Sequence, residues 1–191
     1  MYILGIGGSP RRKGLSNSLL ENALQGARSE GAHIEKIILN DLAIKPCQDC
    51  GGCADTGACV IDDGMKKVRA EIAAADGIII ASPIYFGSIT AQLKAAIDRF
   101  QDAWQAKFIL KVHYMPPKTR KGALLVVSGS ERTNDLENAR HIVKKLFATL
   151  DIEYFGDLFI GGSDIMDKAS GKKDDAMKKA FELGASLARG I

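Results

Sequence analysis

Four cysteines in one short segment are the residues of this sequence best suited to chemistry. Cys47, Cys50, Cys53 and Cys59 are the only cysteines in the 191-residue chain, and they follow the spacing C-x2-C-x2-C-x5-C. Thiolates at such short intervals, with glycines between them, can surround a compact metal centre, and the spacing is similar to that of bacterial ferredoxin ligands. A [4Fe–4S] cluster is therefore the leading candidate ligand of the segment 45–62.

Two other interpretations of these cysteines stay open. Zinc also binds four thiolates, although its usual cysteine pairs are separated by a longer spacer than this chain provides. The cysteines can also be reduced thiols, or form a redox-labile disulfide, with no metal bound, because spacing shows a capacity to bind and not occupancy.

A second candidate site follows the first apolar run of the chain. Residues 2–7 lead into a polar segment with glycines, 8–18, after which apolar residues recur at helical spacing. A helix N-terminus presents free N–H groups and a partial positive charge, so it can bind phosphate without a metal. We expect the phosphate contacts to come from Ser9, Arg11, Ser16, Asn17 and Ser18. The structural alternative is that Ser16 or Asn17 only caps the helix.

Two better-known phosphate loops are excluded by single residues. A dinucleotide-binding G-x-G-x-x-G motif would need glycine at position 10, where Pro10 stands. A Walker loop would need lysine directly after Gly14, and the residue there is Leu15.

Aromatic residues follow the third apolar run, at 77–82. The segment consists of Pro83, Ile84, Tyr85, Phe86 and Gly87. Proline stiffens the turn, glycine permits close backbone approach, and the aromatic pair offers a flat apolar wall to a planar ring such as an isoalloxazine. The alternative is that both aromatic residues pack into the core. Ser128 and Gly129, after the fourth run, are candidates for a third wall of the same crevice.

The elements that must position these residues alternate between strands and helices. We expect strands at 2–7, 34–39, 77–82, 122–128 and 156–161, and helices at 16–30, 63–75, 90–104, 134–150 and 171–188. The strands are rich in apolar residues and short, which favours parallel strands buried on both faces. The predicted fold class is α/β: a flavodoxin-like three-layer sandwich with a five-stranded parallel sheet in the order 2-1-3-4-5, whose ligands bind at the carboxyl ends of the strands.

One long connection, 105–121, lies outside this alternation. It carries Lys107, Lys111, Lys118, Arg120 and Lys121 and no acidic residue. We expect a solvated loop, with contact to an acidic redox partner or to the phosphate of NADPH as the minor alternative. Trp104 is expected in the core or at a subunit interface. His33, His113 and His141 have no partner spacing and are expected at the surface.

Length and composition narrow the class of protein. The chain suits one domain over residues 1–191, with a cysteine-rich loop at 45–62 and a basic loop at 105–121. A formal net charge of +3, without a basic and aromatic run, argues against nucleic acid as a partner. The first residues lack a basic leader, and no stretch approaches the roughly 20 apolar residues that cross a bilayer. We therefore expect a cytoplasmic protein that does not bind membranes.

Taken together, these motifs resemble those of the iron–sulfur flavoproteins, within the flavodoxin-like NAD(P)H-dependent FMN reductases. The resemblance rests on Gly8-Ser-Pro-Arg11, Ser16-Asn17-Ser18, Ser82 to Gly87, Gln92-Leu-Lys94 with Asp98-Arg99, and the four cysteines, in that family's order over roughly residues 1–130. It implies FMN, with its phosphate in the segment 8–18 and its ribityl chain and ring along Pro83 to Gly87. It also implies a [4Fe–4S] cluster on the four cysteines and a homodimer or homotetramer. The chain departs from the family where a Gly-Gly loop often follows the fourth strand, because it has Ser128-Gly-Ser-Glu131 there.

The resemblance implies an oxidoreductase that passes electrons between FMN, the cluster and a partner such as ferredoxin or NAD(P)H. Two alternatives are kept. One is an NAD(P)H-dependent reductase of flavins, quinones or nitro compounds without a bound cluster. The other is a zinc-bearing binding module with no redox activity. No catalytic side chain is predicted, because the chemistry belongs to the cofactors.

Overall fold

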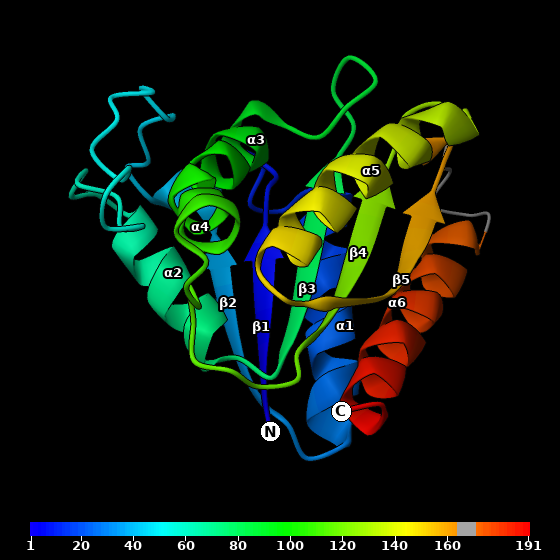
Figure 1. Ribbon diagram of the computed structural model, residues 1–191. Coiled ribbons are helices and arrows are strands. Elements are labelled where there is room, and N and C mark those ends of the chain that lie inside the picture. The colour runs from blue at the N-terminus through cyan, green and yellow to red at the C-terminus, as the bar shows by residue number, and fades with distance from the viewer. Residues whose placement is uncertain (164–170) are drawn as a thin grey trace.

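A parallel sheet forms the centre of the computed structural model, which describes residues 1–163 and 171–191. Its strands are β1 (Tyr2–Gly7), β2 (His33–Ile38), β3 (Gly77–Pro83), β4 (Lys121–Val127) and β5 (Glu153–Ile160). They lie in the order β2-β1-β3-β4-β5, and every neighbouring pair is parallel (Figure 1). The predicted fold class and strand order are confirmed.

Helices cover both faces of the sheet and make the three layers. On one face lie α1 (Leu15–Ser29) and α6 (Lys172–Arg189). The other face is covered by α2 (Met65–Ala74), α3 (Ala91–Asp98), α4 (Gln101–Trp104) and α5 (Thr133–Thr149). A short 3-10 helix, η1 (Leu39–Asp41), follows β2. In the described part of the chain, no helix combines the length and the apolar character that crossing a bilayer requires.

Burial follows the position of each strand in the sheet. The central strands β1, β3 and β4 are buried almost throughout, as their apolar runs predict. The edge strand β2 is different, because only Ile37 is fully buried and half of its residues are exposed. In the other edge strand, β5, only Ile160 is fully buried. The expectation that all five strands are buried on both faces is therefore wrong for the two edge strands, which have a neighbouring strand on one side only.

Two glycines let α1 and α6 approach at backbone distance. A Cβ atom on Gly184 would lie 1.8 Å from the carbonyl oxygen of Ala23, and one on Gly26 would lie 2.0 Å from that of Phe181. Any side chain at either position would push the helices apart. This contact fixes α1, whose N-terminus carries the predicted phosphate site.

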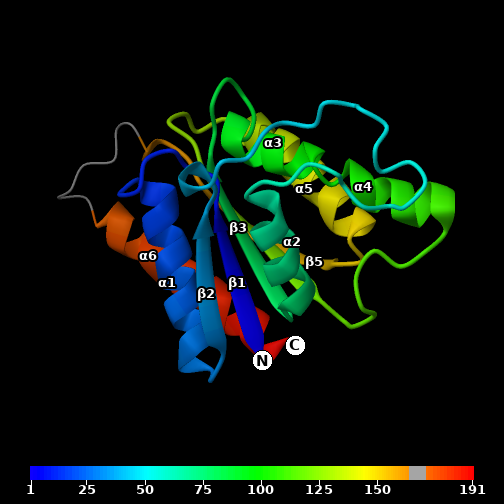
Figure 2. The same ribbon diagram turned by 90° about the vertical axis from the view of Figure 1, so that its left-hand side faces the viewer.

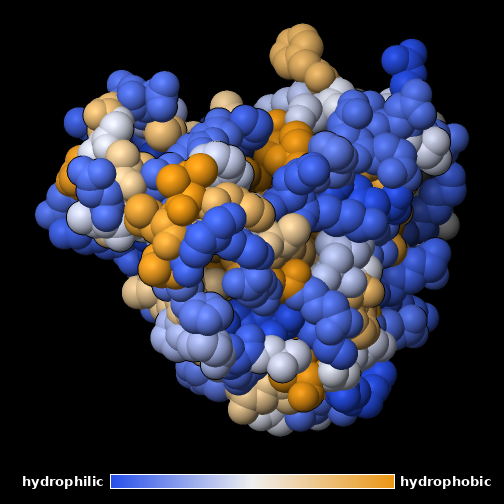
Figure 3. Space-filling model, viewed as in Figure 1, coloured by the Kyte–Doolittle hydropathy of each residue, from blue (hydrophilic) through white to orange (hydrophobic). Residues whose placement is uncertain are grey.

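The predicted helix 90–104 is divided and also continues further. It forms α3 and α4, which are followed directly by η2, a π-helix over Gln105–Leu110. The beginning of the segment predicted as loop 105–121 is thus helical. Figure 3 shows hydrophobic side chains gathered over α4 and this π-helix. The exposed large side chains of this stretch are Trp104, Phe108, Ile109 and Val112. Trp104 is 44% exposed and not part of the core of this chain, which corrects that interpretation of it.

The basic segment is not freely solvated either. Lys107 forms an ion pair with Asp151 at 2.5 Å, and Lys118 forms one with Asp76 at 2.6 Å. Arg120 is buried, and its guanidinium donates to the carbonyl oxygen of Ala73 at the end of α2. The acidic partners come from distant parts of the sequence, so they were not visible within the segment. The three histidines are exposed, as expected.

Candidate functional site

Loops after several strands meet at the carboxyl edge of the sheet and line one cleft of about 430 Å³. The cleft brings together the first loop (residues 8–14), the second loop (84–90) and the third loop (128–132). Its lining residues are Ser9, Arg11, Gly14, Leu15, Ser16, Pro83, Ile84, Tyr85, Val127, Gly129 and Ser163. Seven of these are residues predicted from the sequence.

The first loop ends at the N-terminus of α1. Gly14 is the N-cap residue, and no side chain caps the helix, so the alternative role of Ser16 or Asn17 as a cap is wrong. The N–H groups of a helix's first turn have no acceptor within the helix, and Leu15 and Ser16, where α1 begins, line the cleft. Ser9 and Ser16 are buried beside them, whereas the Arg11 side chain is exposed.

Asn17 holds the first loop in shape. Its Nδ2 donates to the carbonyl oxygen of Arg11 at 2.9 Å. Its Oδ1 is buried without a hydrogen-bond partner among the described residues. A Cβ on Gly7 would lie 2.6 Å from that oxygen, so glycine is needed there. Ser18 is half-buried, and its hydroxyl donates to the carbonyl oxygen of Gly14 at 3.3 Å. Neither Asn17 nor Ser18 lines the cleft directly.

The second loop makes a tight turn in which Tyr85 and Ser88 exchange backbone hydrogen bonds. Ile84 N donates to the carbonyl oxygen of Val127 at 2.7 Å, which ties this loop to the end of β4. Tyr85 lines the cleft and is 41% exposed. Phe86 lies at the tip with φ at 51° and a side chain that is fully exposed, so it gives the cleft no wall in this conformation. Gly87 has φ at 74° and also lies outside the cleft lining.

The third loop is organised by Asp135, in the first turn of α5. Its Oδ2 accepts hydrogen bonds from the hydroxyls of Ser128 and Ser130, each at 3.1 Å. Ser128 is buried in this network, while Gly129 lines the cleft. Sequence reasoning missed Asp135 and also Ser163, which follows β5 and lines the cleft. The rule that ligands bind beyond the carboxyl ends of the strands points to Ser163.

The four cysteines line a second cavity, of about 210 Å³, with Arg99, Asp102 and Trp104 among its other walls. All four are free thiols; Cys50 is exposed and the others are partly buried. Iron–sulfur clusters are held by four cysteine sulfurs, so the residue types that line this cavity are those that such a cluster requires. In the conformation described, no three His, Cys, Asp or Glu side chains of the described residues are gathered closely enough to hold a metal ion.

The cysteine loop (residues 45–62) lies along α4 and the π-helix (Figure 2). Gln105 Nε2 donates to the carbonyl oxygen of Ala54 at 3.0 Å. Gly57 approaches so closely that a Cβ there would lie 2.8 Å from that of Ala106. Burial raises the pKa of the Cys53 thiol, and the nearby Asp102 carboxylate raises it further.

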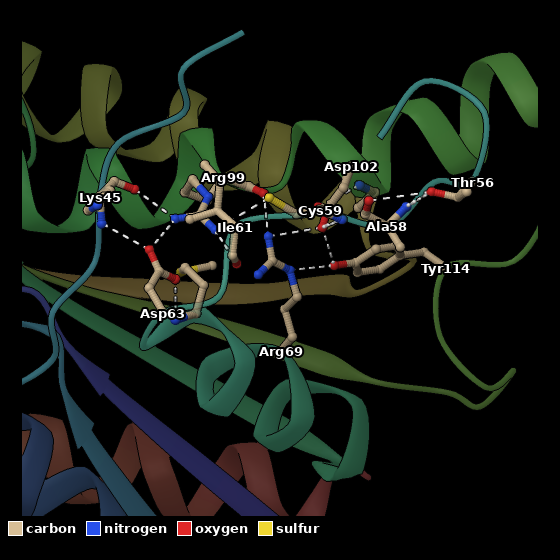
Figure 4. A network of polar contacts seen from close by, with 12 residues as sticks. Lys45, Thr56, Ala58, Cys59, Ile61, Asp63, Arg69, Arg99, Asp102 and Tyr114 are labelled. Atoms are coloured by element: carbon tan, nitrogen blue, oxygen red, sulfur yellow. Dashed lines mark hydrogen bonds and ion pairs between the residues drawn. The ribbon is translucent and has the colours of Figure 1, made fainter. Parts of the chain in front are cut away.

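Two polar residues join this loop to the helices (Figure 4). The Asp102 carboxylate accepts from the backbone N–H of Cys59 at 3.3 Å and from the hydroxyl of Tyr114 at 3.1 Å, and it pairs with Arg69 at 2.9 Å. Burial raises the pKa of Tyr114, and the same carboxylate adds to that effect. Arg99 makes the other set of contacts, with the cysteine loop and with Asp63.

The sheet order and the cleft at the carboxyl ends of β1, β3 and β4 define a flavodoxin-like protein. Solved structures share this fold. A flavone reductase superposes with a TM-score of 0.73 at 22% identity, covering 100% of this chain and 62% of that one. The NAD(P)H:quinone oxidoreductase from Methanothermobacter marburgensis gives 0.73 at 17% identity, covering 98% and 96%. A flavodoxin from the domain Archaea gives 0.60 at 11%, covering 100% and 98%.

Sequence comparison identifies the family. Residues 1–152 match the family model described as NADPH-dependent FMN reductase. An iron–sulfur flavoprotein of Methanocaldococcus jannaschii is 32% identical over 195 residues, covering 98% of this chain and 96% of the relative. One from Methanosarcina thermophila is 38% identical over 130 residues, covering 68% and 64%. The chain belongs to the NADPH-dependent FMN reductase family and, within it, to the iron–sulfur flavoproteins. It is an FMN-dependent oxidoreductase.

Proposed function

We propose that this chain binds FMN in the cleft and a [4Fe–4S] cluster on Cys47, Cys50, Cys53 and Cys59, and that it transfers electrons between a donor and a partner protein. The observation that carries the proposal is that all four cysteines line one cavity in a chain of an FMN-dependent family. When bound, the flavin exchanges one or two electrons and the cluster exchanges single electrons. The protein itself supplies position and electrostatics.

The FMN phosphate is assigned to the first loop, with contacts from Ser9, Arg11, Ser16 and the free amides of the α1 N-terminus. Support comes from the buried hydroxyls of Ser9 and Ser16 and from a helix N-terminus that no side chain caps. Hydrogen-bond donors of this kind bind a phosphate dianion. Asn17 and Ser18 support the loop from behind. The positive end of the helix attracts the phosphate without a metal ion.

The ribityl chain and the ring are assigned to the other two loops. Pro83, Ile84 and Tyr85 form one side, and Gly129 with Ser128 behind it forms the other. Phe86 and Gly87 belong to this proposal only as the rim of the cleft, because the Phe86 side chain is fully exposed.

The two proposed sites lie at opposite ends of one run of helix. Thr90 precedes α3 beside the second loop, and Arg99 follows α3 beside the cysteine loop. The same run therefore positions both cofactors. We further propose that residues 1–191 act as one domain and that the chain forms a homodimer or homotetramer. The exposed apolar side chains of α4 and the π-helix support such an assembly. Ferredoxin or NAD(P)H is the proposed electron donor, and four free thiols favour the cytoplasm.

A second candidate function is an NAD(P)H-dependent reductase of flavins, quinones or nitro compounds with unmetallated cysteines. It is favoured by one observation, that residues 1–152 match the family model described as NADPH-dependent FMN reductase. The zinc-bearing module without redox activity is not proposed, because the family that the chain belongs to is a redox family.

Anaerobic purification with cofactor analysis separates these functions. We expect FMN and about four iron and four sulfide per chain, a number set by the cluster type. A Cys53→Ser variant should keep FMN and lose iron, since it removes one ligand and leaves the cleft intact. Flavin without iron or sulfide, together with rapid bleaching by NADPH, would establish the reductase function instead.

A further inference from the structure

Arg99 is a buried cation at the junction between α3 and the cysteine loop. Its side chain has no exposed surface and contacts three parts of the chain (Figure 4). Nη1 donates to Asp63 Oδ2 at 2.5 Å and to the carbonyl oxygen of Lys45 at 2.8 Å. Nη2 donates to the Cys59 sulfur and to the carbonyl oxygen of Ile61, each at 3.4 Å. The guanidinium thus holds both ends of the cysteine loop and contacts one of the four sulfurs.

A carboxylate pairs with this guanidinium on one side only. Burying a cation is costly unless a carboxylate pairs with it, and Asp63 does so from one side. The second nitrogen has no carboxylate partner among the described residues and is directed at sulfur instead. Arginine keeps its proton in proteins, so this side chain carries its charge even where it is buried. Arg99 remains a cation beside Cys59.

Arg99 is the one cationic side chain of the described residues that lines the cavity. Asp102 also borders the cavity, but its carboxylate is paired with Arg69. Cys59 therefore has two charged neighbours. Arg99 donates a hydrogen bond to its sulfur, and Asp102 accepts one from its backbone N–H. Arg99 and Asp102 are the charged side chains that line the cavity with the cysteines, apart from Asp49 of the loop itself.

We propose that Arg99 is a positioning residue of the cysteine centre, which fixes Cys59 as a ligand and raises the reduction potential of the bound cluster through its hydrogen bond and charge at that sulfur. The inference rests on the proposed function. Hydrogen bonds to the sulfurs and local charge are the levers by which proteins set cluster potentials. Reduction adds one negative charge to the cluster, so a nearby cation favours the reduced state.

Three variants of the FMN-loaded, iron-loaded protein test this inference, with the potential measured by a dithionite titration followed by electron paramagnetic resonance. Arg99→Gln removes the charge and should lower the reduced-to-oxidised ratio about tenfold, which for one electron is about 59 mV. Arg99→Lys keeps a cation and should shift the potential less. Asp63→Asn leaves the cation and removes its counter-charge, so the potential should rise. The flavin potential, measured in the same titration, should change less than the cluster potential in each variant.

The outcomes separate this inference from the proposed function. If the wild-type chain binds no iron, the proposed cluster is wrong and this inference falls with it. If the wild type binds iron but Arg99→Gln keeps the wild-type potential, only the inference is overturned. Should Arg99→Gln fail to fold, Asp63→Asn and Arg99→Lys decide, because an unchanged potential in Asp63→Asn is incompatible with a charge effect at this site.

Discussion

The hydroxyl of Thr90 donates a 2.6 Å hydrogen bond to the carbonyl oxygen of Gly8, and thereby joins two loops that are 82 residues apart. Both groups are buried. The same hydroxyl accepts from the N–H of Leu93 and caps α3. One oxygen atom therefore fixes the first loop to the second loop and sets where the helix begins.

Replacing Thr90 by valine should weaken both FMN binding and the fold. The variant loses an N-cap and leaves a buried carbonyl without a partner, which together cost about 2 kcal/mol. We expect FMN affinity to fall about tenfold, or about 1.4 kcal/mol, in a fluorescence titration. Thr90→Ser is the matched control, because it keeps the hydroxyl and should retain most of the affinity. Equal affinity of the valine variant and the wild type would contradict a coupling of the two loops.

Phe86, in contrast to Thr90, is expected to contribute little to FMN binding. Its side chain is fully exposed, and its φ of 51° is a conformation that favours glycine. Phe86→Gly should therefore leave FMN affinity within about twofold of the wild type and raise the unfolding free energy by up to about 1 kcal/mol. Chemical denaturation and a flavin titration check both values. A large loss of FMN affinity would show that Phe86 closes over the bound ring.

Gly184→Ala tests the contact between α1 and α6. The added Cβ would lie 1.8 Å from the Ala23 carbonyl oxygen, which only a backbone shift can relieve. We expect a loss of about 1–3 kcal/mol in the free energy of unfolding. Gly156→Ala, where no atom lies within 4 Å of the added carbon, should be nearly neutral in the same urea titration. Similar stabilities for the two variants would contradict the close approach.

Acid stability should depend on Asp157. Burial raises the pKa of this carboxyl, but hydrogen bonds from Arg140 and Tyr154 outweigh that effect, so its pKa is lowered. The unfolded chain then binds more protons in acid, so this stabilisation is present above about pH 4 and is lost as the pH falls below it. Asp157→Asn should be about 1–3 kcal/mol less stable at neutral pH and should lose less stability between about pH 5 and pH 3. Urea midpoints across that range measure both effects.

A control for this pH dependence is Asp55→Asn, because Asp55 is exposed in the cysteine loop. Its stability profile should follow that of the wild type. If Asp157→Asn follows the same profile, the carboxylate contributes nothing to the stability of the folded state.

The strand order was predictable because apolar runs and turn residues mark buried parallel strands strongly. The three central strands differ from their predicted bounds by one residue at most at either end. Parts of the site were also predictable: Ser9, Ser16 and Tyr85 follow strands at the carboxyl edge, and the structure brings them to one cleft. Local sequence was enough there because topology places successive strand ends together.

Other features depend on residues that are distant in the sequence. Lys118 has no acidic neighbour in its own segment, and its partner Asp76 comes from the connection between α2 and β3. Nothing near Asp135 in the sequence marks it as the acceptor for both serines of the third loop. The contact between Arg99 and Cys59 joins positions 40 residues apart, and spacing alone does not reveal it.

The helical run from Thr90 to Arg99 also determines how the two sites are placed. With a rise of about 1.5 Å per residue, nine residues set an axial offset of about 14 Å between the loop that holds Thr90 and the guanidinium beside Cys59. Inserting a single residue into α3 would turn everything beyond it by about 100° about the axis, and Arg99 would then face away from the sulfur. The length of α3 is consequently constrained in this protein. Relatives that keep both sites are expected to tolerate insertions in their loops but not in this helix.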